Sequence, residues 1–229
     1  MLHPTPQSTA KNRIYKELRR SIIVGRREPG ERLSMEELAE SYGTSVTPVR
    51  DALQMLSQEG LVTIRPRSGY FVTRITLKEL RDLLEMREIL ELAAVERAAA
   101  RITDEQLDHL ERVHYGYTGD DDESYDRYTD ENRHFHYLIA EASGNRALAE
   151  ALGRLHDRLA RFMVMRRAGQ TMEYTHARII EALRSRDVAE ARRAMYDEIV
   201  ETRDAILDHA IREEGEHWHL GTRGQAPRR

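Results

Sequence analysis

The sequence contains no cysteine among its 229 residues. Disulfides and thiolate metal sites are therefore excluded, and any metal ion must be held by histidine nitrogen and by carboxylate or amide oxygen. Long hydrophobic runs are also missing, because charged residues interrupt every apolar stretch well before the roughly 20 residues that a membrane span needs. The first ten residues lack the apolar segment of a secretory signal, so we expect a cytoplasmic protein.

Glycine, proline and aromatic residues are few: 13 Gly, 6 Pro and 6% aromatic residues exclude collagen-like and low-complexity chains. The net charge of -4 is unevenly distributed along the chain. Residues 1–75 carry 12 Lys and Arg against 8 Asp and Glu, whereas the remainder carries 24 against 32. A basic front part joined to an acidic rear part indicates that only the front part meets a polyanion.

The front part has the pattern of three helices followed by a hairpin. Apolar residues at i, i+4 and i+8 predict a first helix that ends near Gly25. Ser34 and Ser45 each stand where a helix N-cap is expected, and Gly43 separates the two short helices that they begin. Two β-branched and aromatic runs, 61–64 and 70–73, predict a hairpin with a basic tip.

Two helices joined by a glycine turn form a helix-turn-helix, whose second helix presents its N-terminal residues to the major groove of DNA. An arginine there can bond guanine O6 and N7 together, and arginines at a hairpin tip can contact phosphates or the minor groove. For each arginine taken alone, a solvated surface charge is the alternative interpretation. The candidate DNA-binding residues are Ser45, Thr47, Arg50, Arg65, Arg67, Arg13 and Lys16.

The rear part has the pattern of an all-helical bundle. Capping motifs at Thr76, Thr103 and Asp187 mark helix starts. We predict helices at residues 77–101, 104–115, 124–142, 146–168, 172–184 and 188–213. The expected fold is mainly α, with an N-terminal winged helix-turn-helix and a C-terminal bundle of six to seven helices. The expected domains are a flexible tail (1–10), a winged helix (11–75), an effector-binding and dimerisation domain (76–215) and a second tail (216–229).

Polar residues on the expected bundle helices fit a site for a divalent metal ion. Asn132 and His136 lie on one helix face, and His176 and Glu198 lie eleven residues either side of the joint at Asp187. A satisfied core histidine, or a Glu198 that pairs with a nearby arginine, is the alternative. Arg87 lies on the apolar stripe of the first bundle helix and needs an anion, either a bundle carboxylate or a ligand.

The run from Gly30 to Leu53, which contains Thr47-Pro-Val-Arg50, together with Glu59-Gly-Leu-Val62 and Gly69-Tyr-Phe-Val72, resembles the winged helix of GntR-family transcriptional regulators. The resemblance implies that Arg50 is the best candidate for base contact. Val46 stands where the family usually has arginine, and Glu36 stands where some members have one. These departures imply an operator unlike the commonest ones of the family, or a lower affinity.

The rear part resembles the helical effector domain called FCD, through Glu88-Ile-Leu-Glu91, Asn132-Arg-His-Phe-His136, Ser143-Gly-Asn145 and the spacing to His176. Metal-binding members present Asp or Asn followed by three histidines, so Glu198 replaces the last histidine. The formal charge of the ligand set stays at -1, with harder oxygen donation. The resemblance implies zinc, nickel or manganese as the metal, and Arg87 as a clamp for a carboxylate beside it.

The sequence therefore predicts a ligand-responsive, DNA-binding regulator, most simply a repressor released by a small organic acid. It is expected to be a homodimer that binds a palindromic operator. A metal-free regulator and an architectural DNA binder are alternatives. A metal-dependent hydrolase is disfavoured because the sequence lacks HExxH, P-loop and GxSxG motifs, so we expect no enzyme. The effector, the metal and the operator sequence stay open.

Overall fold

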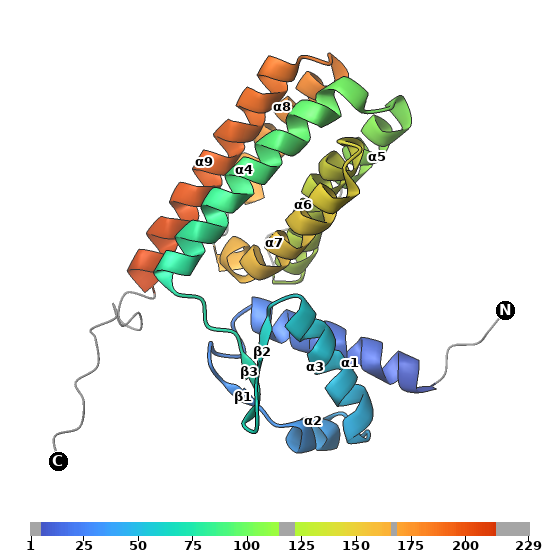
Figure 1. Cartoon of the computed structure of the whole chain (residues 1–229), viewed down its shortest axis with the longest axis vertical. Helices are drawn as coiled ribbons and strands as arrows, with labels where there is room; N and C mark the ends of the chain where they lie inside the picture. The colour runs from blue at the N-terminus through green and yellow to red at the C-terminus, as the bar shows by residue number, and fades with distance from the viewer. Residues whose placement is uncertain (1–5, 115–121, 166–168, 214–229) are drawn as a thin grey trace.

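The computed structural model describes residues 6–114, 122–165 and 169–213. It consists of a small winged helix and a larger helical domain, with the winged helix at one end of the long helices (Figure 1). The predicted fold class is confirmed. Within the described residues, no helix is both long enough and apolar enough to span a membrane.

The winged helix contains three helices and a three-stranded antiparallel sheet. Its elements in chain order are α1 (Pro6–Ile23), β1 (Arg32–Leu33), α2 (Met35–Ser41), α3 (Val46–Gln58), β2 (Val62–Arg65) and β3 (Gly69–Val72). The periodic residues Ile14, Leu18 and Ile22 are fully buried against α3 and the sheet. The strand order is β1-β3-β2. The edge strand β1 was not predicted, because a strand of only two residues has no detectable period.

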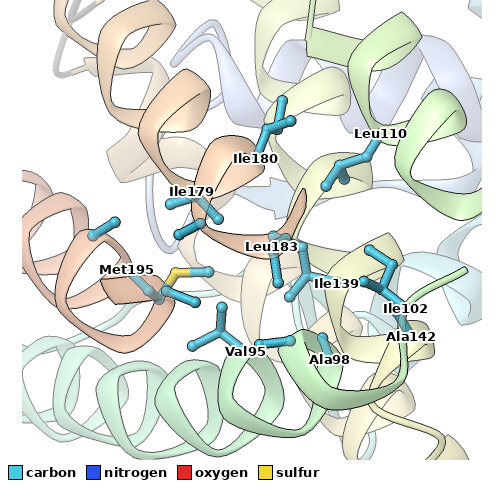
Figure 2. Packing of buried hydrophobic residues seen from close by; sticks show 14 of the residues in the cluster. Val95, Ala98, Ile102, Leu110, Ile139, Ala142, Ile179, Ile180, Leu183 and Met195 are labelled. Carbon is cyan, nitrogen blue, oxygen red and sulfur yellow. The ribbon is translucent and has the colours of Figure 1, made fainter. Parts of the chain in front are cut away.

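The helical domain contains α4 (Leu77–Arg101), α5 (Asp104–His114), α6 (Asp122–Ala142), α7 (Arg146–Met165), α8 (Gly169–Arg184) and α9 (Val188–Glu213). The long helices α4 and α9 lie side by side (Figure 1). One apolar cluster joins α4, α6, α8 and α9 through residues such as Val95, Ile139, Leu183 and Met195 (Figure 2). A second apolar cluster joins α4 to α7 and α9 and includes Leu84. Arg87 and Glu91 lie between Leu84 and Val95 in α4, so they lie where the two clusters meet.

The predicted helix starts of the helical domain are set by the expected caps. Thr76 and Glu79 form a complete capping box, and Thr103 and Gln106 exchange the same pair of hydrogen bonds. The carboxylate of Asp187 accepts from the amide of Glu190 at 3.0 Å. These bonds satisfy amides that the first turn of a helix leaves without partners.

The cap at Ser45 differs from the expectation. Ser45 is the N-cap of α3, but its side chain makes no capping hydrogen bond. The reason is local: the third helical position, whose amide a cap would usually bind, is Pro48, which has no N–H. The exposed hydroxyl of Ser45 is therefore not engaged by the helix that it begins.

Some helix boundaries also differ. The first helix begins at Pro6, inside the segment 1–10 that was expected to be a flexible tail, because proline is well suited to the first turn of a helix. Helices α6 and α8 begin at Asp122 and Gly169, two and three residues before their predicted starts. Residues 115 and 166–168, and the predicted tail 216–229, lie outside the described part of the chain.

Candidate functional site

The N-terminal end of α3 presents a polar surface. Ser45, Thr47 and Arg50 are all exposed there. Val46, between them, is partly buried and packs against the core of the winged helix. Val46 therefore contributes to the packing of the winged helix, and it offers no polar group for base recognition.

The hairpin of β2 and β3 carries two further exposed arginines. Arg65 lies with its guanidinium carbon 4.4 Å from the ring centre of Phe71, a cation–π contact that orients the side chain along the wing. Arg67, at the tip, has a φ of 63°. Both side chains keep their charge in solvent.

The basic residues of α1 differ from each other. Lys16 is exposed. The Nη2 atom of Arg13 donates to the carbonyl of Tyr42 at 3.1 Å, at the C-cap of α2. Arg13 thus also stabilises the turn of the helix-turn-helix, a role that its sequence position did not reveal.

A set of polar side chains from five helices, α4, α6, α7, α8 and α9, is buried inside the helical domain, and we call it the buried polar cluster. Each member is less than a tenth exposed. Its members are Arg87, Glu91, Asn132, His136, His156, His176, Glu198 and Thr202. It includes all four predicted metal ligands and the predicted effector-binding arginine.

Arg87 and Glu198 form the closer of the two arginine–carboxylate pairs in the cluster. Nη2 of Arg87 lies 2.8 Å from Oε2 of Glu198, and the hydroxyl of Thr202 donates to Oε1 at 2.8 Å. Burial alone would raise the pKa of Glu198, but the charge of Arg87, followed by that of His136, outweighs it and lowers the pKa to about 2. The alternative that Glu198 pairs with a nearby arginine is therefore realised in this structure.

Glu91 contacts two histidines, His136 and His156. Its Oε1 lies 3.0 Å from Nδ1 of His136 and 2.7 Å from Nε2 of His156. Burial would raise the pKa of Glu91, but its interactions with His136 and His156 hold it well below the usual value. Burial lowers the pKa of His156. On its other side, Nε2 of His136 lies 3.4 Å from Nη2 of Arg87, and because a guanidinium only donates, Nε2 is the acceptor in this pair.

Two sets of possible metal ligands share His136. His136, His176 and Glu198 offer ligand atoms within 4.8 Å of one another, and so do Glu91, His136 and His156. The first set contains three of the four predicted ligands, and Asn132 lies one turn before His136 on α6. The second set has its atoms at hydrogen-bond distances and is better explained as a carboxylate that orients two imidazoles.

The predicted ligand set fits a divalent ion chemically. The Oδ1 atom of buried Asn132 has no hydrogen-bond partner among the described residues. Nε2 of His136 lies 3.9 Å from Oε2 of Glu198, a separation that one ion can bridge. A neutral imidazole nitrogen, an amide oxygen and a carboxylate are all donors that zinc, nickel or manganese accept.

Glu91, His156 and Thr202 were not predicted as members of the site. Glu91 follows Arg87 by one helical turn on a buried stripe, so an ion pair within α4 was a detectable signal. His156 lies on α7, which supplies none of the predicted ligands. No spacing in the sequence relates α7 to the others, so only the packing of α7 against α4 and α6 reveals His156.

The acid dependence of stability follows from the lowered pKa values. Groups whose pKa is depressed by folding stabilise the protein above their unfolded value of 4.5, and this contribution is lost as the pH falls toward 2. For Glu198 the loss is expected to be about 3 kcal/mol in the metal-free protein. Urea unfolding at pH 7 and pH 3 should show about 2 kcal/mol of this loss, because Glu198 is only partly protonated at pH 3 in the folded protein. Glu198→Gln should have a visibly flatter pH profile than the unsubstituted protein, and equal profiles would contradict this assignment.

The fold, the exposed polar surface of the winged helix and the buried polar cluster together define a class of protein. In this class a winged-helix DNA-binding domain is attached to a helical domain that contains a polar site. Comparison with known families gives the same assignment. Residues 10–72 match the family described as bacterial regulatory proteins, gntR family, and residues 82–212 match the FCD domain. The chain belongs to the GntR family and carries an FCD effector domain.

The curated relatives are named as transcriptional regulators. The chain is 28% identical to the HTH-type transcriptional repressor RspR of Escherichia coli, over 93% of this chain and 95% of RspR. It is 31% identical to the HTH-type transcriptional repressor GlaR of Escherichia coli, over 79% of this chain and 88% of GlaR. The protein is accordingly a GntR-family transcriptional regulator with a ligand-responsive domain.

Solved structures have the same fold. The structure of Escherichia coli McbR/YncC superposes with a TM-score of 0.69 at 24% identity, covering 91% of this chain and 98% of that chain. A putative transcriptional regulator GntR from Rhodococcus sp. RHA1 gives a TM-score of 0.65 at 22% identity, covering 87% and 98%. At these identities the likeness establishes the architecture alone.

Proposed function

We propose that this protein is a homodimeric repressor that binds a palindromic operator. Its affinity for the operator is controlled by a small carboxylate that binds, together with a divalent metal ion, at the buried polar cluster. The observation that carries the proposal is the convergence of Asn132, His136, His176 and Glu198, next to Arg87, inside the helical domain. Two of the relatives are named repressors, which supports the direction of control. The proposal places the protein in the cytoplasm, with its DNA.

Charge supports the pairing of a metal with an acid. Arg87, Glu91 and Glu198 carry a net charge of -1 when both carboxylates are ionised. An additional carboxylate would then be repelled, and a buried uncompensated charge is costly. A divalent cation held by Asn132, His136, His176 and Glu198 would make the cluster positive and supply a coordination position for a carboxylate oxygen. An acid with one carboxylate then brings the net charge to zero.

Arg87 has a specific part in this scheme. Its guanidinium is fully buried and already engaged by Glu198 at 2.8 Å. An incoming carboxylate therefore competes with Glu198 for Arg87, and it succeeds more easily when Glu198 has another cation to neutralise. Arg87 can bind such a carboxylate through two parallel N–H donors.

A metal-free regulator is the second candidate function. The observation that favours it is the same Arg87–Glu198 pair, which neutralises the carboxylate without any ion. In that case the effector binds directly to the polar side chains. A cation would neutralise the net charge of -1, and a neutral polar molecule would leave it unchanged, so either avoids the repulsion that a carboxylate would meet.

The DNA-binding part of the proposal depends on exposed side chains. Ser45, Thr47 and Arg50 at the start of α3 would lie in the major groove. Arg65 and Arg67 on the wing, with Lys16 and Arg13 on α1, would contact phosphates. In a dimer two such surfaces contact the two halves of an operator with two-fold symmetry.

Metal titration separates the two candidates. Protein stripped with a chelator and titrated with Zn²⁺, Ni²⁺ or Mn²⁺ in a calorimeter is expected to bind one ion per chain. His136→Ala should weaken binding by about 100-fold or more, since loss of a single ligand removes most of the affinity of a small site. His109→Ala, at an exposed histidine of α5, is the matched control and should bind normally. No binding in the unsubstituted protein would eliminate the metal and leave the metal-free regulator.

A further inference from the structure

A group of charged residues lies between the winged helix and the helical domain, and we call it the interdomain ion-pair cluster. Arg19 of α1 is its centre: its three guanidinium nitrogens lie 3.3 Å from Glu59, 2.9 Å from Asp130 and 3.5 Å from Asp157. Arg133 of α6 lies 2.7 Å from Asp157. Arg19, Glu59 and Asp157 are 13%, 19% and 6% exposed, so solvent screens these pairs less than surface pairs.

The interdomain ion-pair cluster is one residue away from the buried polar cluster on two helices. On α7, His156 donates to Glu91 inside the buried polar cluster, and the next residue, Asp157, pairs with Arg19. On α6, Asn132 belongs to the buried polar cluster, and the next residue, Arg133, pairs with Asp157. A small rotation or translation of either helix therefore acts on both clusters together.

The same group of charges reaches the helix that carries the candidate DNA contacts. Glu59 is the C-cap of α3, the helix that begins at Val46 beside Ser45. The hydroxyl of Tyr15 on α1 donates to Glu59, and burial followed by this bond raises the pKa of Tyr15 well above its usual value, so it stays a donor. Helix α7 also approaches the end of α3 directly, since a Cβ at Gly60 would lie 3.0 Å from Cγ of Arg158.

The carboxylate of Asp157 on α7 contacts both an arginine of the winged helix and an arginine of the helical domain. Oδ1 of Asp157 lies 2.7 Å from Nε of Arg133 and 3.5 Å from Nη2 of Arg19. The two arginines thus share an acceptor, and Arg133 also donates from Nη2 to Oδ2 of Asp157 at 3.1 Å, so a movement of Asp157 changes the contacts of both arginines. Arg19 also contacts Glu59 and Asp130, so it stays ion-paired if its contact with Asp157 is lost.

From these contacts we infer that Asp157 is the coupling residue that transmits the state of the buried polar cluster to the winged helix. A ligand that moves His136 or Asn132 on α6 relative to His156 on α7 changes the Arg133–Asp157 pair. Arg19 then moves toward or away from Asp157 and carries α1 and the end of α3 with it. This inference rests on the proposed function, because it supposes that occupancy of the buried polar cluster controls DNA binding.

The substitution Asp157→Asn tests the inference, since it keeps the shape and removes the charge. The assay is the affinity of the full chain for a duplex selected by the unsubstituted protein from a random-sequence pool, measured with and without saturating Zn²⁺. Allosteric couplings are typically about 5- to 150-fold, so Zn²⁺ should change the DNA affinity of the unsubstituted protein by about fivefold or more. In Asp157→Asn, Zn²⁺ should still bind with unchanged affinity but alter DNA binding less than about twofold.

A second arm needs neither metal nor effector. Glu91→Gln alters the buried polar cluster directly, and its effect on DNA affinity is measured alone and together with Asp157→Asn. We expect Glu91→Gln to change DNA affinity by about fivefold alone and by less than about twofold in the Asp157→Asn background. Glu150→Gln removes an exposed ion pair with Arg146 on the same helix and should leave the response unchanged.

The outcomes are distinguishable. Failure of Zn²⁺ to bind overturns the metal in the proposed function, and the second arm then decides the inference alone. A full response to Zn²⁺ or to Glu91→Gln in the Asp157→Asn background overturns the inference while leaving the proposed function intact. If neither Zn²⁺ nor Glu91→Gln changes the DNA affinity when Asp157 is present, both the inference and the proposed function are overturned.

Discussion

Replacement of Arg87 by Met is expected to lower the free energy of unfolding of the metal-free protein by about 3 to 5 kcal/mol. Met fills much of the volume of arginine but leaves the carboxylate of Glu198, which is 1% exposed, without its counter-ion 2.8 Å away. Glu91 also loses the positive charge of Arg87, whose Nε lies 3.5 Å from Oε1 of Glu91. Urea unfolding followed by circular dichroism at pH 7 measures the change.

The double substitution Arg87→Met with Glu198→Gln is the control for this effect. It removes both charges of the pair, so the carboxylate of Glu198 is no longer left without a counter-ion, and we expect the double variant to be more stable than Arg87→Met alone. Neither variant changes His136 or His156, which lie 3.0 Å and 2.7 Å from Oε1 of Glu91, so the surroundings of Glu91 differ in the same way from the unsubstituted protein in both. If Arg87→Met unfolds at the same urea concentration as the unsubstituted protein, Arg87 does not neutralise the cluster.

Replacement of Arg50 by Ala is expected to weaken binding to a selected duplex by about 10- to 100-fold, the cost of one arginine that reads a base through two bonds. Arg50 is exposed in the first turns of α3, so its removal should leave the fold unaffected. Fluorescence anisotropy with the selected duplex and with a scrambled duplex of equal length measures the loss and its sequence dependence.

Two matched arginines show whether the loss at Arg50 is specific. Arg67→Ala, at the tip of the wing, should weaken binding to both duplexes equally and reduce the slope of affinity against salt by about one ion. Arg146→Ala, at an exposed arginine of α7 in the helical domain, should have no effect. Equal losses on both duplexes for Arg50→Ala would mean that Arg50 contacts phosphate and not a base.

Much of the architecture follows from short-range patterns in the sequence. The period of Ile14, Leu18 and Ile22 indicates a buried helix face, and the capping boxes at Thr76 and Thr103 locate helix starts, because both signals arise from neighbours within one or two turns. The same logic brought Asn132 and His136 onto one face. Arg87 was recognised because a charge on an apolar stripe requires a partner.

The residues that were missed depend on packing between distant segments. His156 contributes to the buried polar cluster only because α7 crosses α4 next to Glu91, 65 residues earlier in the chain. Arg19 meets Asp157 across 138 residues, and neither residue has a periodic or capping signature. Long-range pairs of this kind are set by how helices dock, which local patterns in a single sequence do not encode.

The central claim is that the state of the buried polar cluster sets the affinity for DNA. The most direct test measures the affinity of the unsubstituted protein for its selected duplex in three conditions: with a chelator, with bound metal, and with bound metal plus each small carboxylic acid that calorimetry shows to bind. We expect at least one of these acids to weaken DNA binding by about fivefold or more, and the double substitution Arg87→Met with Glu198→Gln to abolish the response. An affinity that is the same in all three conditions would contradict the central claim.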